Sequence, residues 1–390
     1  MKPAIYLDYA AATPMDESVF AAMQPFFMQQ FYNPSATYLA AQKVHKQLEA
    51  ARAGVAHWLG SRPNEIVFTA GSTEANNLVI HGVMQQFLTG AHAEAENANC
   101  VVSTIEHESV LESAKQYNYK LAPVQANGVI DLAQLENLID DQTVLISVMY
   151  ANNEIGTVQP IHKIGQLAQA IRKKRRAAGN KLPLYVHTDA AQAAAYLDLH
   201  VARLGVDFLT LNGGKMYGPK QSGVLFADAH ARLVPLVYGG GQERGLRSGT
   251  ENIAGSVGLA TALNVVQSRR HQEQQRLKIL QDLFFNLLEG QFGDAITING
   301  SRDVRLPNNV HVTFTGHDNE RILMELDEKG IMCAAGSACS ASNEEPSHVL
   351  RALGLTDAEA QASIRFTMGI QTTEADIRTV VAELAKLIRA

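Results

Sequence analysis

Lys215 is the residue whose setting in this sequence most strongly suggests chemistry. An apolar run at residues 208–211 stops at Asn212-Gly213-Gly214, and the lysine follows at once. Ligands of open α/β sheets collect at the carboxyl ends of the strands, so a lysine just past a strand is well placed to meet one. A lysine after two glycines is more commonly a solvated loop residue. The other polar residues of the chain must therefore decide between these two interpretations.

Several polar side chains follow other predicted strands in the same way. Strands are expected at residues 67–68, 100–104, 144–150, 184–187, 208–211 and 223–227, with helical patterns such as 132–139 and 164–178 between most of them. Strands that alternate with helices indicate a mainly parallel sheet covered on both faces. The carboxyl ends of parallel strands share one edge, so we expect these side chains to meet there: Thr73, His107, Asn153, Asp189 and Lys215.

These residue types suit pyridoxal phosphate (PLP). A lysine amine forms a Schiff base with the aldehyde of this cofactor, and a carboxylate such as Asp189 keeps the pyridine nitrogen protonated. Free N–H groups at a helix start such as Gly71-Ser72-Thr73 bind phosphate, although the same residues alone would be an ordinary helix cap. His107 lies between two glutamates, but no further metal ligands are in view. The combination, rather than any one residue, predicts the cofactor.

The composition excludes several classes of protein. The 390 residues are 46% hydrophobic and 18% charged with a net charge of −6, which is typical of a globular enzyme and argues against nucleic acid as a partner. Three cysteines fit neither a disulfide framework nor a zinc spacing. We find no signal peptide, no apolar run of the roughly 20 residues that span a membrane, and no P-loop or dinucleotide motif. We expect a cytoplasmic protein.

The pattern of elements changes after the middle of the chain. A short arm (1–14) precedes a helix at 17–30, capped by Asp16, and a second helix at 38–59. After a long helical region at 256–290, the pattern becomes α+β, with strands at 310–314 and 330–334 and helices at 319–329, 346–353 and 373–388. We therefore predict a large α/β domain (15–262) and a small α+β domain formed by 1–14 and 263–390.

Many short blocks along the chain resemble those of one enzyme family. They are LDYAAATP, NPS, EIVFTAGSTEANN, EHESVL, NNEIG, HTDAAQ, GGGQERGLRSGT, GSAC and SIRFTMG, in this order. The sequence resembles the cysteine desulfurases of the NifS and IscS kind, in the class V aminotransferase family. The resemblance implies PLP fold type I with a mainly parallel seven-stranded sheet, a homodimer, and conversion of L-cysteine to L-alanine. The sulfur would pass to the enzyme and then to an acceptor protein.

The resemblance also implies roles for residues around the cofactor ring. Lys215 would hold the cofactor covalently and later remove the Cα proton of the substrate. Asp189 would pair with the pyridinium nitrogen, Gln192 would contact the phenolic oxygen, and His107 would stack on the ring and take part in catalysis.

For the phosphate, the resemblance implies contacts from Ser72 and Thr73, and from Thr250 of the other protomer. The family commonly has serine and histidine where this chain has Asn212 and Gly214. Asn212 can still donate a hydrogen bond, whereas Gly214 keeps only its backbone N–H. We therefore predict weaker retention of the cofactor than in relatives that have the histidine.

Substrate and sulfur contacts are implied in the same way. Asn153 and Arg365 match positions that hold cofactor or substrate oxygens, and an arginine can grip a carboxylate with two hydrogen bonds. Cys339, within a run of small residues at 335–342, would be the nucleophile that takes the sulfur as a persulfide. Cys100 and Cys333 lie in apolar strand patterns, where we expect buried and inert thiols.

Other functions remain open at this stage. They are a selenocysteine lyase, another class V aminotransferase or β-lyase in which Cys339 has no role, and a degenerate homologue that serves only as a dimeric scaffold. The sulfur acceptor could belong to iron–sulfur cluster assembly, to a tRNA-thiolation relay or to a DNA-sulfur modification system.

Overall fold

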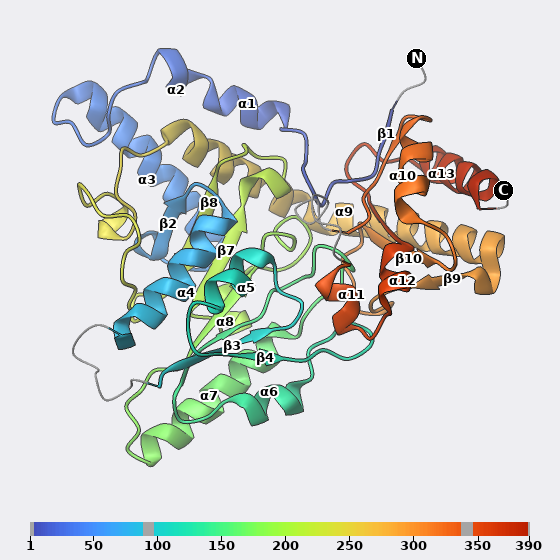
Figure 1. The fold of residues 1–390 in the computed structure, drawn as a ribbon. Helices are drawn as coiled ribbons and strands as arrows, with labels where there is room; N and C mark the ends of the chain where they lie inside the picture. The colour runs from blue at the N-terminus through green and yellow to red at the C-terminus, as the bar shows by residue number, and fades with distance from the viewer. Residues whose placement is uncertain (1–3, 89–96, 337–345, 389–390) are drawn as a thin grey trace.

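A seven-stranded sheet forms the centre of the larger part of the molecule (Figure 1). The computed structural model describes residues 4–88, 97–336 and 346–388. The strand order is β2-β8-β7-β6-β5-β3-β4. In chain order the strands are β2 (Ile66–Thr69), β3 (Asn99–Ser103), β4 (Tyr119–Ala122), β5 (Thr143–Ser147), β6 (Tyr185–Asp189), β7 (Phe208–Asn212) and β8 (Gly223–Ala227). Only β8 runs opposite to the others, which confirms the predicted mainly parallel sheet.

Both faces of this sheet are covered, as the apolar strands require. Cys100 and Val102 of β3 belong to one buried cluster, whereas Val101 between them belongs to another. Successive side chains of a strand point to opposite faces, so the two clusters are the two sides of the sheet. Helix α4 (Ser72–Leu88) packs on β7 and β8, and α7 (Ile161–Ala177) packs on β6. Other helices of this region are α3 (Leu39–Leu59), α5 (Glu108–Ala114), α6 (Leu132–Leu138) and α8 (Val201–Leu204).

Two smaller sheets lie at the other end of the molecule. One has the order β12-β10-β9, and the other pairs β1 with β11. The strands are β1 (Ile5–Tyr6), β9 (Ile296–Ile298), β10 (Asn309–Phe314), β11 (Ile331–Met332) and β12 (Ser363–Thr367). The helices beside them are α10 (Asn319–Asp327), α11 (His348–Ala352), α12 (Asp357–Gln361) and α13 (Glu374–Leu387). Helix α9 (Ile253–Phe292) is continuous through the predicted domain boundary at 262, and Figure 1 shows it reaching from the large sheet toward the small ones.

One local expectation was wrong, and the strands β4, β9 and β12 were not predicted. The helix predicted at 17–30 is split into α1 (Glu17–Met23) and α2 (Pro25–Met28), because Pro25 has no N–H with which to continue the first helix. Asp16 does cap α1, accepting a hydrogen bond from Ser18 N at 2.8 Å. Strand β12 was not predicted, although all five of its residues are buried. The charged Arg365 at its centre interrupts the apolar pattern that identifies a buried strand.

Among the described helices, none combines the length and the apolar character needed to cross a membrane.

Candidate active site

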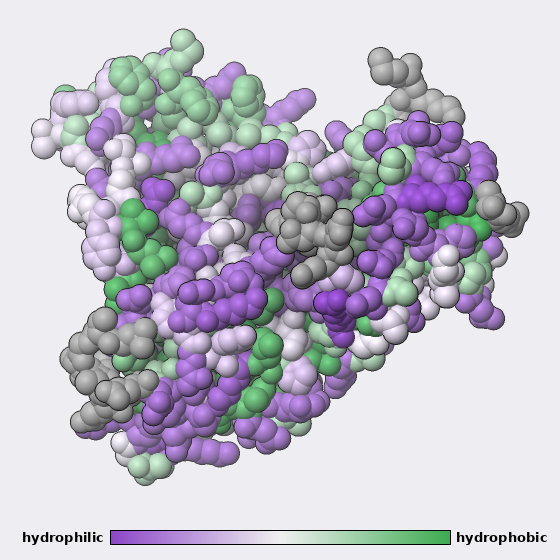
Figure 2. Space-filling view, viewed as in Figure 1, coloured by the Kyte–Doolittle hydropathy of each residue, from purple (hydrophilic) through white to green (hydrophobic). Residues whose placement is uncertain are grey.

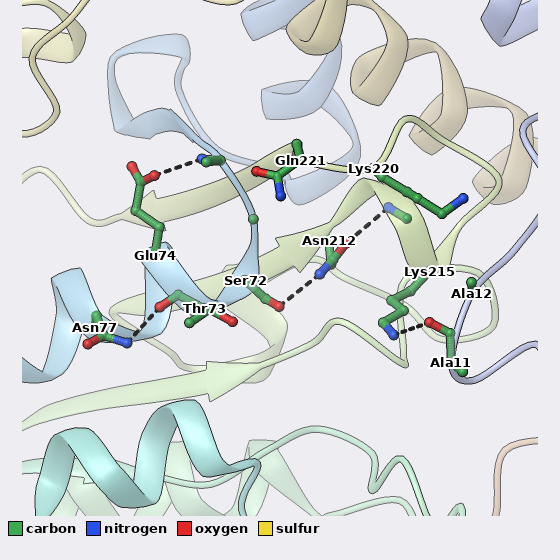
Figure 3. A pocket seen from close by; sticks show the side chains of 13 residues that line it. Ala11, Ala12, Ser72, Thr73, Glu74, Asn77, Asn212, Lys215, Lys220 and Gln221 are labelled. Carbon is green, nitrogen blue, oxygen red and sulfur yellow. Dashed lines mark hydrogen bonds between the residues drawn. The ribbon is translucent and has the colours of Figure 1, made fainter. Parts of the chain in front are cut away.

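The carboxyl edge of the large sheet brings the predicted polar residues together. Two adjoining cavities, of about 600 and 70 Å3, share Ala11, Ser72 and Lys215 in their walls. Thr73, Asn212 and Gly214 line the larger one (Figure 3). The smaller one is lined by the other predicted groups, namely His107, Asn153, Asp189, Gln192 and Arg365. Residues separated by up to 355 positions therefore meet at one place, and those that follow strands of the large sheet do so as its parallel topology predicts.

Lys215 ends a short 3₁₀ turn, Gly213–Lys215, directly after β7. Its Nζ donates hydrogen bonds to the carbonyl oxygens of Ala10 at 3.0 Å and Ala11 at 2.5 Å. Figure 3 shows the amine turned toward this N-terminal segment. Ala10 and Ala11 were not predicted as site residues, because a backbone carbonyl leaves no side-chain signal in a sequence.

The start of α4 forms one end of the larger cavity. Asn212 Nδ2 donates to Ser72 Oγ at 2.9 Å, and Asn212 Oδ1 accepts the backbone N–H of Gly214 at 2.9 Å. The first N–H groups of a helix have no partner within it, so this end of the cavity suits an anion. Lys220 also lines the cavity and was not predicted. It adds positive charge to the same wall.

Asp189 and His107 lie in the smaller cavity and share a hydrogen-bond network. Asp189 is the last residue of β6 and is 6% exposed. It accepts hydrogen bonds from Asn76 Nδ2 at 2.7 Å and from Ala191 N at 2.9 Å. His107 caps α5, where its Nδ1 accepts the backbone N–H of Ser109 at 3.0 Å. The neutral imidazole therefore carries its proton on Nε2.

The carboxyl group of Glu106, next to His107, is buried and hydrogen-bonded within the protein. Glu106 accepts hydrogen bonds from Ser103 Oγ at 2.5 Å and Met149 N at 2.7 Å. Burial raises the pKa of Glu106 to about 8, so the carboxyl is largely protonated at neutral pH. No group of three or more metal-ligating side chains occurs in the described part of the chain.

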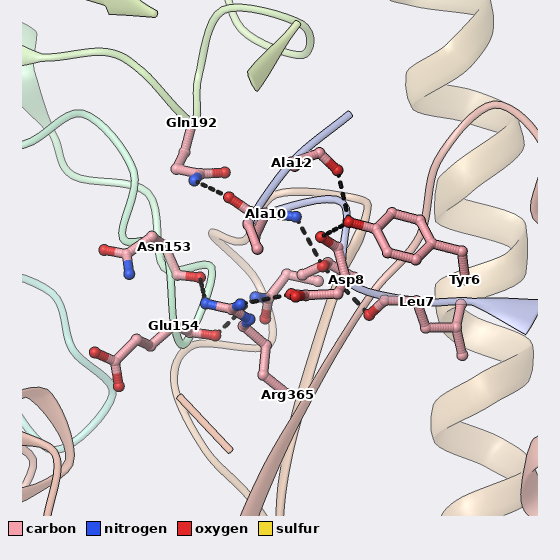
Figure 4. A network of polar contacts seen from close by, with 12 residues as sticks. Tyr6, Leu7, Asp8, Ala10, Ala12, Asn153, Glu154, Gln192 and Arg365 are labelled. Carbon is pink, nitrogen blue, oxygen red and sulfur yellow. Dashed lines mark hydrogen bonds and ion pairs between the residues drawn. The ribbon is translucent and has the colours of Figure 1, made fainter. Parts of the chain in front are cut away.

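Arg365 reaches the site from β12 in the small sheet. It is 1% exposed, and its guanidinium donates to Asp8 Oδ1 at 2.7 Å and to the carbonyl oxygen of Asn153 at 3.0 Å (Figure 4). Gln192 Nε2 donates to the carbonyl oxygen of Ala10 at 3.0 Å. The segment from Asp8 to Ala11 thus contacts Arg365, Gln192 and Lys215, and it links groups from both ends of the molecule.

Two predicted residues are not part of these cavities. Thr250 is exposed and lines neither of them, although its predicted role requires a second protomer. Cys339 lies outside the described residues. The other thiols are poor candidates, because burial raises the pKa of Cys100 to about 12 and also strongly raises that of Cys333.

Comparison with known proteins places the chain among enzymes with this architecture. The family model described as aminotransferase class-V matches residues 5–380. The chain belongs to the class V aminotransferase family. This finding confirms the resemblance inferred from the sequence blocks, and PLP is the cofactor of this family.

Individual relatives are similar over their whole length. The chain is 37% identical to the cysteine desulfurase IscS of Dictyoglomus turgidum, over 100% of this chain and 95% of the relative. It is also 37% identical to the cysteine desulfurase IscS of Clostridium botulinum strain Hall, with the same coverage. Among solved structures, a NifS-like protein matches with a TM-score of 0.88 at 28% identity, covering 99% of this chain and 100% of that one. The structure of SspA in complex with cysteine matches with a TM-score of 0.79 at 35% identity, covering 93% and 98%.

The side chains present fit PLP. The helix start with Ser72 and Thr73 offers donors to a phosphate, and Asp189 offers a buried carboxylate to a protonated ring nitrogen. Lys215 lines both cavities and therefore lies between the two ends. This polarity, with anion donors at one end and a carboxylate at the other, is the one that the cofactor requires.

Proposed function

We propose that this chain is a PLP-dependent cysteine desulfurase, which converts L-cysteine to L-alanine and passes the sulfur to Cys339 as a persulfide. The observation that carries the proposal is that Lys215, Asp189 and Arg365, from three separate segments, line one cavity. The names of the relatives favour this function over selenocysteine lyase and over other class V reactions. The retained site residues argue against a role as a scaffold alone.

The roles of the side chains follow from their positions. When bound, the cofactor supplies an electron-accepting ring that stabilises negative charge at the substrate Cα. Ser72, Thr73 and Asn212 would bind its phosphate, and Gly214 lines the same cavity. Asp189 would hold the proton on the ring nitrogen, and Lys215 would be the amine that attaches the cofactor and removes the Cα proton.

Four further side chains complete the ring and substrate contacts. His107 would stack on the ring, with Nε2 available to the substrate. Gln192 Nε2, which here donates to the carbonyl oxygen of Ala10, would bind the phenolic oxygen of the cofactor. Asn153 and Arg365 would bind the cofactor and substrate oxygens, including the substrate carboxylate.

Sulfur transfer requires a thiolate in addition to the side chains that bind the cofactor and the substrate. In the step that we propose, the Cβ–S bond of the substrate breaks and a bond forms between the substrate sulfur and Sγ of Cys339. The substrate carbon skeleton gains protons and leaves as alanine, so no external oxidant or reductant is needed. The small residue types next to Cys339 in the sequence, at 335–342, support this assignment.

The direct test is incubation of the PLP-loaded protein with L-cysteine. We expect alanine to form and one sulfur to appear as protein-bound persulfide for each alanine of the first turnover, measured by amino-acid analysis and persulfide labelling. The same assay with L-selenocysteine tests the alternative lyase. No alanine from L-cysteine, or turnover restricted to L-selenocysteine, would contradict the proposal.

A homodimer is part of the proposal. Large apolar side chains are exposed on α1, α2 and the start of α3, including Phe20, Phe27, Met28 and Leu39. Figure 2 shows these elements, in the upper left of the view, carrying a contiguous apolar area. Patches of this kind mark interaction surfaces. In the dimer, the exposed Thr250 would donate to the phosphate bound by the other protomer.

Other parts of the assignment are also proposals. We divide the chain into domains at 15–262 and at 1–14 with 263–390, and this division is supported by the separate sheets at the two ends of α9. We propose a cytoplasmic location and an acceptor protein for the persulfide sulfur. An iron–sulfur scaffold, a tRNA-thiolation relay and a DNA-sulfur modification system are the candidate classes of acceptor.

Restoring a histidine at Gly214 is expected to tighten PLP binding about tenfold, the effect of one added hydrogen bond to phosphate. A Cβ at Gly214 would lie 3.4 Å from Asn212 Oδ1 and 3.7 Å from Lys220 Cγ, which is ordinary contact, and the backbone is not in the left-handed region. The dissociation constant is measured by titrating apo-protein with PLP. Gly214→Ala is the control, because it adds bulk without a donor. A histidine variant that binds no tighter than the alanine variant would count against the predicted weak retention.

Replacing Arg365 with lysine is expected to raise the KM for L-cysteine about 100-fold, because a lysine cannot make the two parallel hydrogen bonds of a guanidinium to a carboxylate. The measurement is initial-rate kinetics over a range of cysteine concentrations. Arg305→Lys is the control, because Arg305 is partly buried and donates to Ser301 O and Asn309 Oδ1 outside both cavities. A normal KM in the Arg365 variant would remove this residue from substrate binding.

A further inference from the structure

Asn76 is a fully buried amide on the face of α4 that carries the proposed phosphate contacts. It is 0% exposed, and it follows Ser72 by four residues and Thr73 by three. Residues with this spacing lie on the same face of a helix. Asn76 is therefore one helical turn after the start of α4. Its side chain lies between this helix and the edge of the sheet.

Both hydrogens of the Asn76 amide are used within the site. Nδ2 donates to Asp189 Oδ2 at 2.7 Å and to Ser109 Oγ at 2.9 Å. Ser109 Oγ in turn lies 2.9 Å from His107 Nδ1. The serine oxygen accepts from Asn76, and its hydroxyl can share the Nδ1 lone pair with the backbone N–H of Ser109. One amide thus connects the carboxylate at the end of β6 with the imidazole at the start of α5.

The amide oxygen of Asn76 indicates which of its contacts require an asparagine at this position. Asn76 Oδ1 is buried and has no hydrogen-bond partner among the described residues. A turned amide would place this oxygen against the Asp189 carboxylate and would lose both donor contacts. A buried polar atom without a partner is unfavourable, so the two donor contacts are what the side chain contributes.

We propose that Asn76 is a positioning residue that connects Asp189 and His107 and sets both groups for the cofactor ring. The inference rests on the proposed function, because it assumes that Asp189 meets the ring nitrogen and that His107 meets the ring face. It adds a residue whose side chain lines neither cavity and acts only through its two neighbours.

The test compares two ligands of the apo-protein: PLP, and an analogue in which carbon replaces the ring nitrogen. The wild type is expected to prefer PLP, because only PLP offers a ring nitrogen to Asp189. In Asn76→Ala, this preference is expected to fall about tenfold, the size of one lost hydrogen bond to a charged group. Affinities are measured by calorimetric and absorbance titration, which do not depend on turnover. Asn76→Asp keeps the side-chain shape, replaces the donor with a second carboxylate beside Asp189, and is expected to lose at least as much of the preference.

The matched control is Asn99→Ala. Asn99 is also buried and donates its Nδ2 to an aspartate carboxylate, Asp140, at 3.0 Å, but it lies at the amino end of β3, opposite the site. We expect this variant to keep the wild-type preference even if its stability falls. Equal losses of affinity for both ligands in the Asn76 variants, or an unchanged preference, would overturn the inference. If the wild type binds PLP and forms alanine, and the Asn76 variants keep the wild-type preference for PLP, only the inference about Asn76 is overturned. If the wild type neither binds PLP nor forms alanine, the proposed function is overturned as well.

Discussion

Lys215→Ala is expected to lower the rate of alanine formation from L-cysteine by about 10⁴-fold, the upper range for loss of a positioned general base. The structure supports this expectation because the amine lies at the junction of the two cavities, where it would be next to the cofactor and to the Cα of a bound amino acid. Among the residues that the structure describes, no other lysine lines the smaller cavity. The variant should still bind PLP, since the phosphate and ring contacts come from other residues, but it should not hold the cofactor covalently.

Two measurements separate these effects. Initial rates of alanine formation give the loss of catalysis, and mass spectrometry after borohydride reduction shows which lysine holds the cofactor. Lys181→Ala is the control, because this lysine is exposed and lies outside both cavities. Cofactor reduced onto a lysine other than Lys215, or a variant that keeps more than a tenth of the wild-type rate, would contradict the assignment.

Cys339→Ser is expected to abolish persulfide formation and to reduce desulfuration to the background rate. A serine hydroxyl stays protonated at neutral pH, whereas a thiol with an ordinary pKa near 8.5 is partly ionised and strongly nucleophilic. The hydroxyl also has no means of forming the sulfur–sulfur bond that carries the product. PLP binding should be unchanged, because none of the proposed cofactor contacts involves this residue.

The chain provides its own controls for this experiment. Cys100 is buried and Cys333 is partly buried, and desolvation raises the pKa of both thiols, so Cys100→Ala and Cys333→Ala should keep persulfide formation on the remaining Cys339. Labelling of the persulfide followed by peptide mapping identifies the cysteine involved. Normal alanine formation in Cys339→Ser would instead favour the β-lyase interpretation, in which this cysteine has no role.

The sequence by itself determined the chemistry that could take place here. The residue types around Lys215, Asp189 and His107 pointed to PLP, and the alternation of strands and helices indicated that their side chains share one edge of a parallel sheet. This inference succeeded because side-chain chemistry and the topology of parallel strands are both local consequences of the sequence pattern. Most strands were also placed correctly, because an apolar run that is buried on both faces is visible in the local sequence.

Only the tertiary structure decided which groups hold these residues in place. Asn76 and Asp189 are 113 residues apart, and Asp8 and Arg365 are 357 apart, yet each pair shares a hydrogen bond of 2.7 Å. The carbonyl oxygens that bind Lys215 come from Ala10 and Ala11, which have no polar side chain to mark them. Contacts of this kind depend on how the chain packs over long separations, and no local pattern of residue types encodes them.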